Sequence, residues 1–201
     1  MGITDNMTWD ETAATRALAP WGKYFRGKPD YSDYVFSFMN KTATALWPHP
    51  EPGWDTERWR DAAGEIPPPG AVPEEKLLGC LAYYYCEGLP SFRLHPNVFP
   101  VVTADRAQWR DPDSRREDAA LLKAWGKSGA RHFGVYDYYY GVDYLIPRVF
   151  LESEIDSIRT AADAEAKMFY AEIFPNWGFD GPKAWLAAQL LRDPHQIAAW
   201  R

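Results

Sequence analysis

Leu77 to Tyr85 reads Leu-Leu-Gly-Cys-Leu-Ala-Tyr-Tyr-Tyr, and residues 98–103 read Val-Phe-Pro-Val-Val-Thr. Neither stretch alternates apolar with polar residues. Continuous apolar runs of this length are typical of strands covered on both faces, as in a parallel sheet. The segment between them, residues 86–97, has no helical period, so this crossover is either irregular or the sheet is mixed there.

Downstream of these runs, strands and helices alternate. Strands are predicted at His132–Tyr138 and Lys167–Phe174, and helices at Arg115–Lys127, near residues 151–162, and from Pro182 onward, where a proline fits the first helical position. Alternation of this kind predicts right-handed βαβ units and a parallel sheet.

The N-terminal part contributes one strong helix and one long loop. Apolar residues recur at three- and four-residue spacings from Tyr31 to Leu46, which predicts an amphipathic helix, and a helical turn is expected within residues 11–18. Residues 48–75 are rich in proline and glycine and predict a long loop. Residues 1–6, which end in Asp-Asn, have the pattern of the last residues of a strand.

These elements amount to four full strands and the tail of a fifth, about half of an eight-stranded closure. We therefore expect an α/β fold, namely the C-terminal half of a (β/α)8 TIM-type barrel, as a single partial domain over residues 1–201. Half a barrel has two open sheet edges. A missing N-terminal half or self-association would cover them, and an open sheet is the alternative.

Composition restricts the classes of partner. The 201 residues carry 22 Lys plus Arg against 28 Asp plus Glu, a net charge of −6, which disfavours nucleic acid. No apolar run is long enough to predict a membrane span, and no signal peptide is recognisable. Cys80 and Cys86 read as buried thiols. No metal-ligand spacing and no phosphate loop occurs in the sequence, so neither a metal nor a nucleotide cofactor is expected.

Aromatic residues make up 16% of the chain, with 10 Trp, 12 Tyr and 10 Phe. Trp and Tyr combine an apolar ring with a polar edge, which suits amphipathic ligands such as sugars as well as a packed core. Several of these rings lie in stretches predicted as loops. A carbohydrate ligand and ordinary core packing are both consistent with this content.

Several short motifs, in this order and at this spacing, resemble a bacterial family known as domain of unknown function 4838. The resemblance covers nearly the whole chain. Two departures are the absence of cysteine from residues 7–18, where that family often has a cysteine cluster, and Arg192, where tryptophan is more usual. The motifs are Asp5-Asn6, Phe38-Met39-Asn40-Lys41-Thr42-Ala43, Leu81-Ala82-Tyr83, Asn97-Val98, Tyr136-Asp137-Tyr138, Phe169-Tyr170-Ala171-Glu172, Asn176-Trp177-Gly178-Phe179-Asp180-Gly181-Pro182 and Leu190-Leu191-Arg192-Asp193-Pro194.

The resemblance implies a glycoside-hydrolase-like barrel, similar in architecture to α-glucuronidases and β-hexosaminidases. Members of this family are typically large and multi-domain, and a full-length relative is expected to be secreted or periplasmic. In such barrels the C-terminal ends of the strands line the site. Glycoside hydrolysis needs two carboxyl groups flanking the scissile bond.

Glu172 and Asp137 follow neighbouring predicted strands, and we expect them on one rim as the catalytic pair. Glu172 comes after an apolar run, surroundings that suit the acid role. A carboxylate at a strand end also often caps a loop or pairs with arginine, and Asp105, with several arginines nearby, is expected to form such an ion pair. The predicted substrate-binding residues are Asp5, Asn6, Tyr84, Tyr138, Asn176 and Trp177.

Three functions are consistent with this sequence. The first is hydrolysis of a glycan through the paired carboxylates. The second is a non-catalytic carbohydrate-binding or scaffolding module, which keeps the sugar-stacking rings without the second carboxyl group. The third is an inactive barrel fragment. Trp177 is either a sugar-stacking platform or a lid over the rim.

Overall fold

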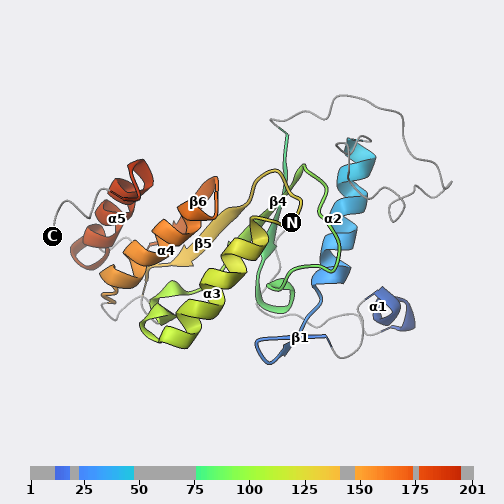
Figure 1. Ribbon diagram of the computed structural model, residues 1–201, viewed down its shortest axis with the longest axis horizontal. Helices are drawn as coiled ribbons and strands as arrows, with labels where there is room; N and C mark the ends of the chain where they lie inside the picture. Colours follow the sequence, from blue (N-terminus) through green and yellow to red (C-terminus); the bar gives the residue numbers. More distant parts are fainter. Residues whose placement is uncertain (1–11, 19–22, 48–75, 141–147, 174–176, 196–201) are drawn as a thin grey trace. The chain divides into compact units, whose positions relative to one another are not determined.

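The computed structural model describes residues 12–18, 23–47, 76–140, 148–173 and 177–195 (Figure 1). The strand tail expected at residues 1–6 and the loop expected at 48–75 lie outside these ranges. The fold is mixed α/β, with a parallel sheet in the order β3-β4-β5-β6 flanked by helices. The predicted parallel α/β class is therefore confirmed, and the chain divides into two compact units, which are described in turn.

The first unit comprises the residues up to Val102 together with Trp125–Phe133. Arg26 and Gly27 link its two short antiparallel strands, and both have positive φ, as a tight hairpin turn with the twist of the strands requires. The elements of the unit are α1 (Ala13–Leu18), β1 (Tyr24–Phe25), β2 (Lys28–Pro29), α2 (Ser32–Leu46), β3 (Leu78–Ala82), the 3-10 helix η2 (Tyr84–Cys86) and β4 (Val98–Thr103), which continues one residue beyond the unit.

The connection between β3 and β4 is irregular, and the two strands are parallel, with Leu78 the register partner of Val98. Asn40, fully buried on α2, holds this connection: its amide donates to Arg93 O at 3.0 Å and its oxygen accepts from His95 N at 2.8 Å. The predicted extension of β3 to Tyr85 is wrong. Tyr84 has a φ of 56°, and the chain there turns into η2.

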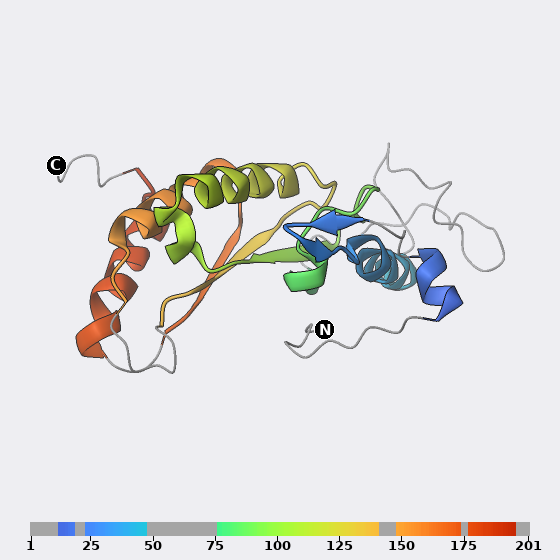
Figure 2. The same cartoon turned by 90° about the horizontal axis from the view of Figure 1, so that it is seen from below.

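The second unit comprises Thr103–Ala124 and Gly134–Arg201. The strands β5 and β6 run side by side and parallel (Figures 1 and 2), with Gly134 opposite Met168 and Tyr138 opposite Glu172. Its elements are the 3-10 helix η3 (Arg106–Arg110), α3 (Pro112–Trp125), β5 (Gly134–Tyr138), α4 (Leu151–Asp163), β6 (Met168–Glu172) and α5 (Trp177–Arg192). The short helix η3 was not predicted, and except for the start of α5 the other elements agree with the prediction to within about three residues.

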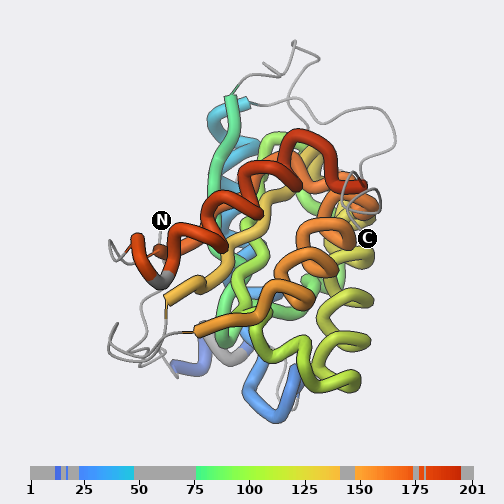
Figure 3. Tube along the Cα trace, turned by 90° about the vertical axis from the view of Figure 1, so that its left-hand side faces the viewer, coloured from blue at the N-terminus to red at the C-terminus, as the bar shows by residue number. Residues whose placement is uncertain are grey.

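The helices α4 and α5 pack against each other (Figure 3) and against one face of β5 and β6. Ile158 of α4 and Leu190 of α5 join Tyr139 in the buried core, and Phe169 and Ala171 of β6 pack on this cluster. Because side chains alternate along a strand, the residues between these project from the opposite face. The helices therefore cover one face of the β5–β6 pair.

α5 begins at Trp177, and the predicted start at Gly181-Pro182 is wrong. Pro182 lies inside the helix, in its second turn. The ring of Pro182 faces solvent, which leaves the buried face to Leu186, Ala187 and Leu190. None of the helices in the ranges given above combines the length and the hydrophobicity needed to cross a bilayer.

Candidate functional site

Glu172 is the last residue of β6, on the face of the β5–β6 pair that the helices α4 and α5 leave uncovered. It is the register partner of Tyr138, so both side chains project from this face. Tyr136, two residues earlier on β5, donates its hydroxyl to Glu172 Oε1. The structure thus brings together two of the predicted site residues, Glu172 and Tyr138.

Four tyrosines and Glu172 form one surface, which we call the tyrosine face. The ring of Tyr136 has its centroid 4.6 Å from that of Tyr170 and 5.5 Å from that of Tyr138, and Tyr138 is 5.9 Å from Tyr140. The Tyr170 side chain is 51% exposed, whereas the other tyrosines are half-buried. The members are Tyr136, Tyr138, Tyr140, Tyr170 and Glu172.

The tyrosine face offers both hydrogen-bonding roles beside its rings. Burial raises the pKa of Tyr136 well above its usual value, and the Glu172 carboxylate raises it further. The Tyr136 hydroxyl therefore stays protonated as a donor, while the Glu172 oxygens accept. Rings beside a fixed donor and a fixed acceptor match the mixed apolar and polar surface of a sugar.

Asp137 does not share this face, and its predicted role as the catalytic partner of Glu172 is wrong. It is the register partner of Ala171, whose side chain packs with the helices, and Asp137 is completely buried. A side chain one residue from Tyr138 on a strand points to the opposite side of the sheet. The two carboxyl groups therefore cannot flank one bond of a bound sugar.

Asp137 belongs instead to a buried charged cluster. The backbone N–H of Arg106 donates to Asp137 Oδ1 at 3.0 Å, and the fully buried Arg106 side chain donates to Tyr136 O at 3.0 Å. Arg106 Nε lies 3.0 Å from Asp118 Oδ2. Burial raises the pKa of Asp137 to about 6, against the opposing effect of Arg106.

Glu154 and Lys183 complete the cluster from α4 and α5. Burial, and then the charge of Asp137, raise the pKa of Glu154 to about 8. Lys183 Nζ donates to Tyr139 O and lies 2.6 Å from Asp180 Oδ1. Glu154 and Asp137 are both fully buried, on the side of the β5–β6 pair away from the tyrosine face.

Neither Glu154 nor Lys183 was predicted to be buried. Each has a signal in the sequence that would have placed it on a buried helix face. Glu154 precedes Ile158 by four residues, and Lys183 precedes Leu186 by three. Because both side chains are charged, the apolar periodicity alone did not assign them to the buried helix face.

The remaining predicted residues are dispersed. Asp5, Asn6 and Asn176 lie outside the described residues. Tyr84 belongs to the first unit, where Lys28 Nζ lies 4.1 Å from its ring centroid. Asp105 forms the kind of ion pair that was predicted, but its partner is Arg148.

Trp177 is the first residue of α5, not a loop residue, and its side chain is 68% exposed. Among the described residues it makes no ring contact with the tyrosine face. Its role as a sugar-stacking platform stays a prediction.

Within the ranges that the structure describes, no group of three or more His, Cys, Asp or Glu residues is arranged to hold a metal ion. Cys80 and Cys86 are buried free thiols; burial raises the pKa of Cys80 to about 11 and also raises that of Cys86. No family model, curated protein or solved structure matches the chain.

Proposed function

We propose that the tyrosine face binds a carbohydrate without cleaving it. One observation supports this proposal above all: the alternation and register of β5 and β6 place Tyr136, Tyr138, Tyr170 and Glu172 on the face that α4 and α5 do not cover, and the ring of Tyr140 packs beside Tyr138. Sugar rings present apolar C–H faces to aromatic side chains and hydroxyl groups to polar ones. Tyr170 is the most exposed of the four rings and is the proposed stacking residue.

Binding is favoured over hydrolysis because, among the residues that the structure describes, the tyrosine face carries one carboxylate, that of Glu172. Hydrolysis by the general mechanism needs an acid and a second carboxylate on either side of the bond. Asp137 and Glu172 are the acidic residues of β5 and β6. Asp137 is buried on the opposite face of these strands from Glu172. Glu172 supplies a charged hydrogen-bond acceptor to the ligand.

The proposal includes the barrel architecture. In a (β/α)8 barrel, helices cover the outer face of each parallel strand pair and the inner face lines the site. The pair β5–β6 fits this arrangement, with α4 and α5 on one face and the tyrosines on the other. The resemblance to domain of unknown function 4838 implies the same architecture and stays part of the proposal.

A glycan array followed by calorimetric titration of the best-binding glycan tests this function. Replacing Tyr170 with Ala removes the exposed ring, and we expect the Kd to rise about tenfold, equivalent to about 1.4 kcal/mol. Glu172→Gln keeps the shape but weakens the acceptor, so a smaller loss of affinity is expected.

Tyr24→Ala is the matched control, because Tyr24 is an exposed tyrosine of the first unit, outside the tyrosine face. It should bind like the unaltered chain. Equal affinities of the Tyr170 and Tyr24 variants would contradict the proposal. Cleavage of the glycan by the unaltered chain, lost in Glu172→Gln, would establish hydrolysis instead.

A further inference from the structure

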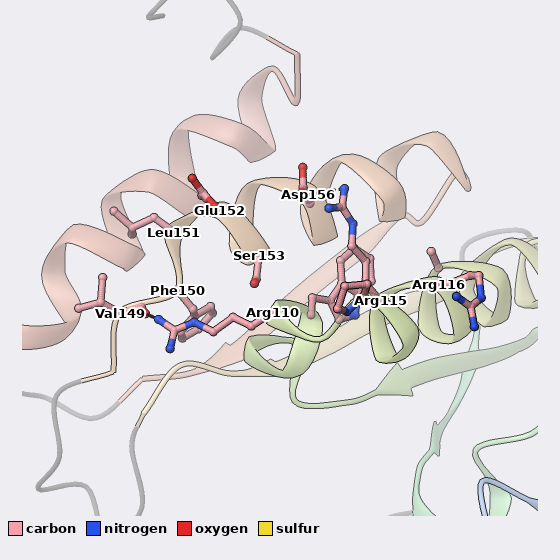
Figure 4. A pocket seen from close by; sticks show the side chains of 12 residues that line it. Arg110, Arg115, Arg116, Val149, Phe150, Leu151, Glu152, Ser153 and Asp156 are labelled. Carbon is pink, nitrogen blue, oxygen red and sulfur yellow. Dashed lines mark hydrogen bonds and ion pairs between the residues drawn. The ribbon is translucent and has the colours of Figure 1, made fainter.

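A second candidate site lies in the second unit, between the η3–α3 segment and the start of α4 (Figure 4). A cavity of about 670 Å³ opens there, within the size range of small-molecule sites. Trp109, Phe150 and Leu151 supply apolar walls, while Arg110, Arg115 and Ser153 supply polar groups. The helix α4 packs on the opposite side of the sheet from the tyrosine face, so the two sites are separate.

The N-terminus of α4 contributes free backbone donors to this cavity. Phe150 precedes the helix and provides no side-chain cap, and Glu154 N is the first amide that bonds back, to Phe150 O at 3.0 Å. The amides of Leu151, Glu152 and Ser153 have no acceptor among the described residues. Unpaired amides at the positive end of a helix dipole favour a bound anion.

Ser153 gives an independent indication of a ligand. Its side chain is only 7% exposed, and its hydroxyl points into the space between α4 and η3 (Figure 4). This hydroxyl has no hydrogen-bond partner in the part of the chain that the structure describes. Ser157, one turn later, donates to Glu154 O at 3.0 Å instead. The Ser153 oxygen is not among the buried side-chain atoms that lack a partner, so it is open to the cavity, where a ligand or water can satisfy it.

The charges around the cavity leave one arginine without an acidic partner. Arg115 Nη2 is 2.8 Å from Asp156 Oδ2, and Arg116 pairs with Asp113 on the rim. Arg110 donates to Val149 O and has no carboxylate partner among the described residues. Glu152 also lines the cavity, but its carboxylate points away from Ser153 in Figure 4.

We infer that this cavity binds a small organic phosphate ester. The amides at the start of α4, the Ser153 hydroxyl and the Arg110 guanidinium would hold the phosphate oxygens, since helix N-termini and arginines are the recurrent phosphate ligands of proteins. The cavity is larger than an inorganic ion needs, and Phe150 and Leu151 offer apolar contact to the organic group. The inference does not depend on carbohydrate binding.

Calorimetric titration with phenyl phosphate tests the inference. We expect binding that weakens as salt rises, and a Kd about tenfold higher in Arg110→Gln and about threefold higher in Ser153→Ala. Arg192→Gln, which removes an exposed arginine at the end of α5, is the matched control and should change the Kd by less than about twofold. Amide resonances of residues 151–153 should shift on binding.

Two further ligands distinguish a site for an organic phosphate ester from a site for inorganic phosphate or for a carboxylate. Inorganic phosphate should bind more weakly than phenyl phosphate, and benzoate, a carboxylate of similar shape, more weakly still. Absence of phenyl phosphate binding at millimolar concentration, equal losses in the Arg110 and Arg192 variants, or tighter binding of benzoate would overturn the inference. Tyr170→Ala should leave phenyl phosphate binding unchanged.

Discussion

Two buried carboxyl groups couple the folding of the second unit to pH. Asp137 and Glu154 are both fully buried, and burial raises their pKa values to about 6 and about 8. A group with a raised pKa in the folded state stabilises that state fully only below its unfolded pKa. Its contribution is lost as the pH rises through the folded value. The stability of the unit should therefore fall between about pH 4.5 and pH 8.

Glu154→Gln should flatten this pH dependence, because glutamine fills the same space without an ionisable proton. Relative to the unaltered chain, the variant should gain about 2–4 kcal/mol in unfolding free energy between pH 5 and pH 9. Urea unfolding at the two pH values measures the difference. Glu152→Gln, an exposed neighbour on the same helix, should show no such gain, and parallel pH profiles for all three chains would refute this account.

At the scale of single residues, some predictions from the sequence agree with the structure and others do not. The strand-end position of Glu172 and the tyrosine next to Asp137 could be read directly. Which face each side chain occupies could not, because the parallel register that sets Tyr138 opposite Glu172 depends on how two distant segments pair. The burial of Arg106 could not be predicted for a related reason. An arginine is buried only with a partner, and the pairing with Asp118 is known only from the structure.

At the scale of elements, Gly129 ends the segment after α3 in a conformation that favours glycine. Its φ is 98°, and an added Cβ would lie 3.0 Å from Arg93 Cβ and 3.1 Å from Leu94 O. Hydrogen bonds on either side, from Leu94 N to Ser128 O and from Arg131 N to Pro96 O, hold this segment against residues 94–96. The backbone cannot move away without breaking them.

Gly129→Ala should therefore destabilise the first unit by about 1–3 kcal/mol, through backbone strain and the close contact with Arg93. Gly79→Ala is the comparison, because Gly79 lies in β3 with nothing within 4 Å of an added Cβ. That variant should be neutral or slightly stabilised. Thermal unfolding of both measures the contrast, and a Gly129 variant as stable as the Gly79 variant would show that the turn adapts.

Helices and strands with a clear pattern of apolar residues were predictable. The differences between the predicted and the observed elements lie at their ends. The apolar spacing from Tyr31 to Leu46 and the buried run at residues 98–103 gave α2 and β4 almost to the residue. β3 stops three residues early because Tyr84 takes a positive φ, which no propensity signals for tyrosine. α5 starts at Trp177 rather than at Gly181-Pro182 because Pro182 is accommodated inside the helix.

At the scale of the whole molecule, the parallel α/β class followed from the alternation of strands and helices, and the four full strands predicted correspond to β3, β4, β5 and β6. The functional proposal depends on a narrower feature within the second unit. The helices α4 and α5 bury one face of β5 and β6, and tyrosines occupy the other. The proposal assigns this face a ligand that stacks on its rings.

Tyrosine-labelled NMR spectra recorded during titration with the best-binding glycan test that claim most directly. The ring signals of Tyr136, Tyr138, Tyr140 and Tyr170 should shift together with one saturation curve, while that of Tyr24 stays in place, because only the first four lie on the tyrosine face. Saturable binding that leaves these four signals unmoved would contradict the account.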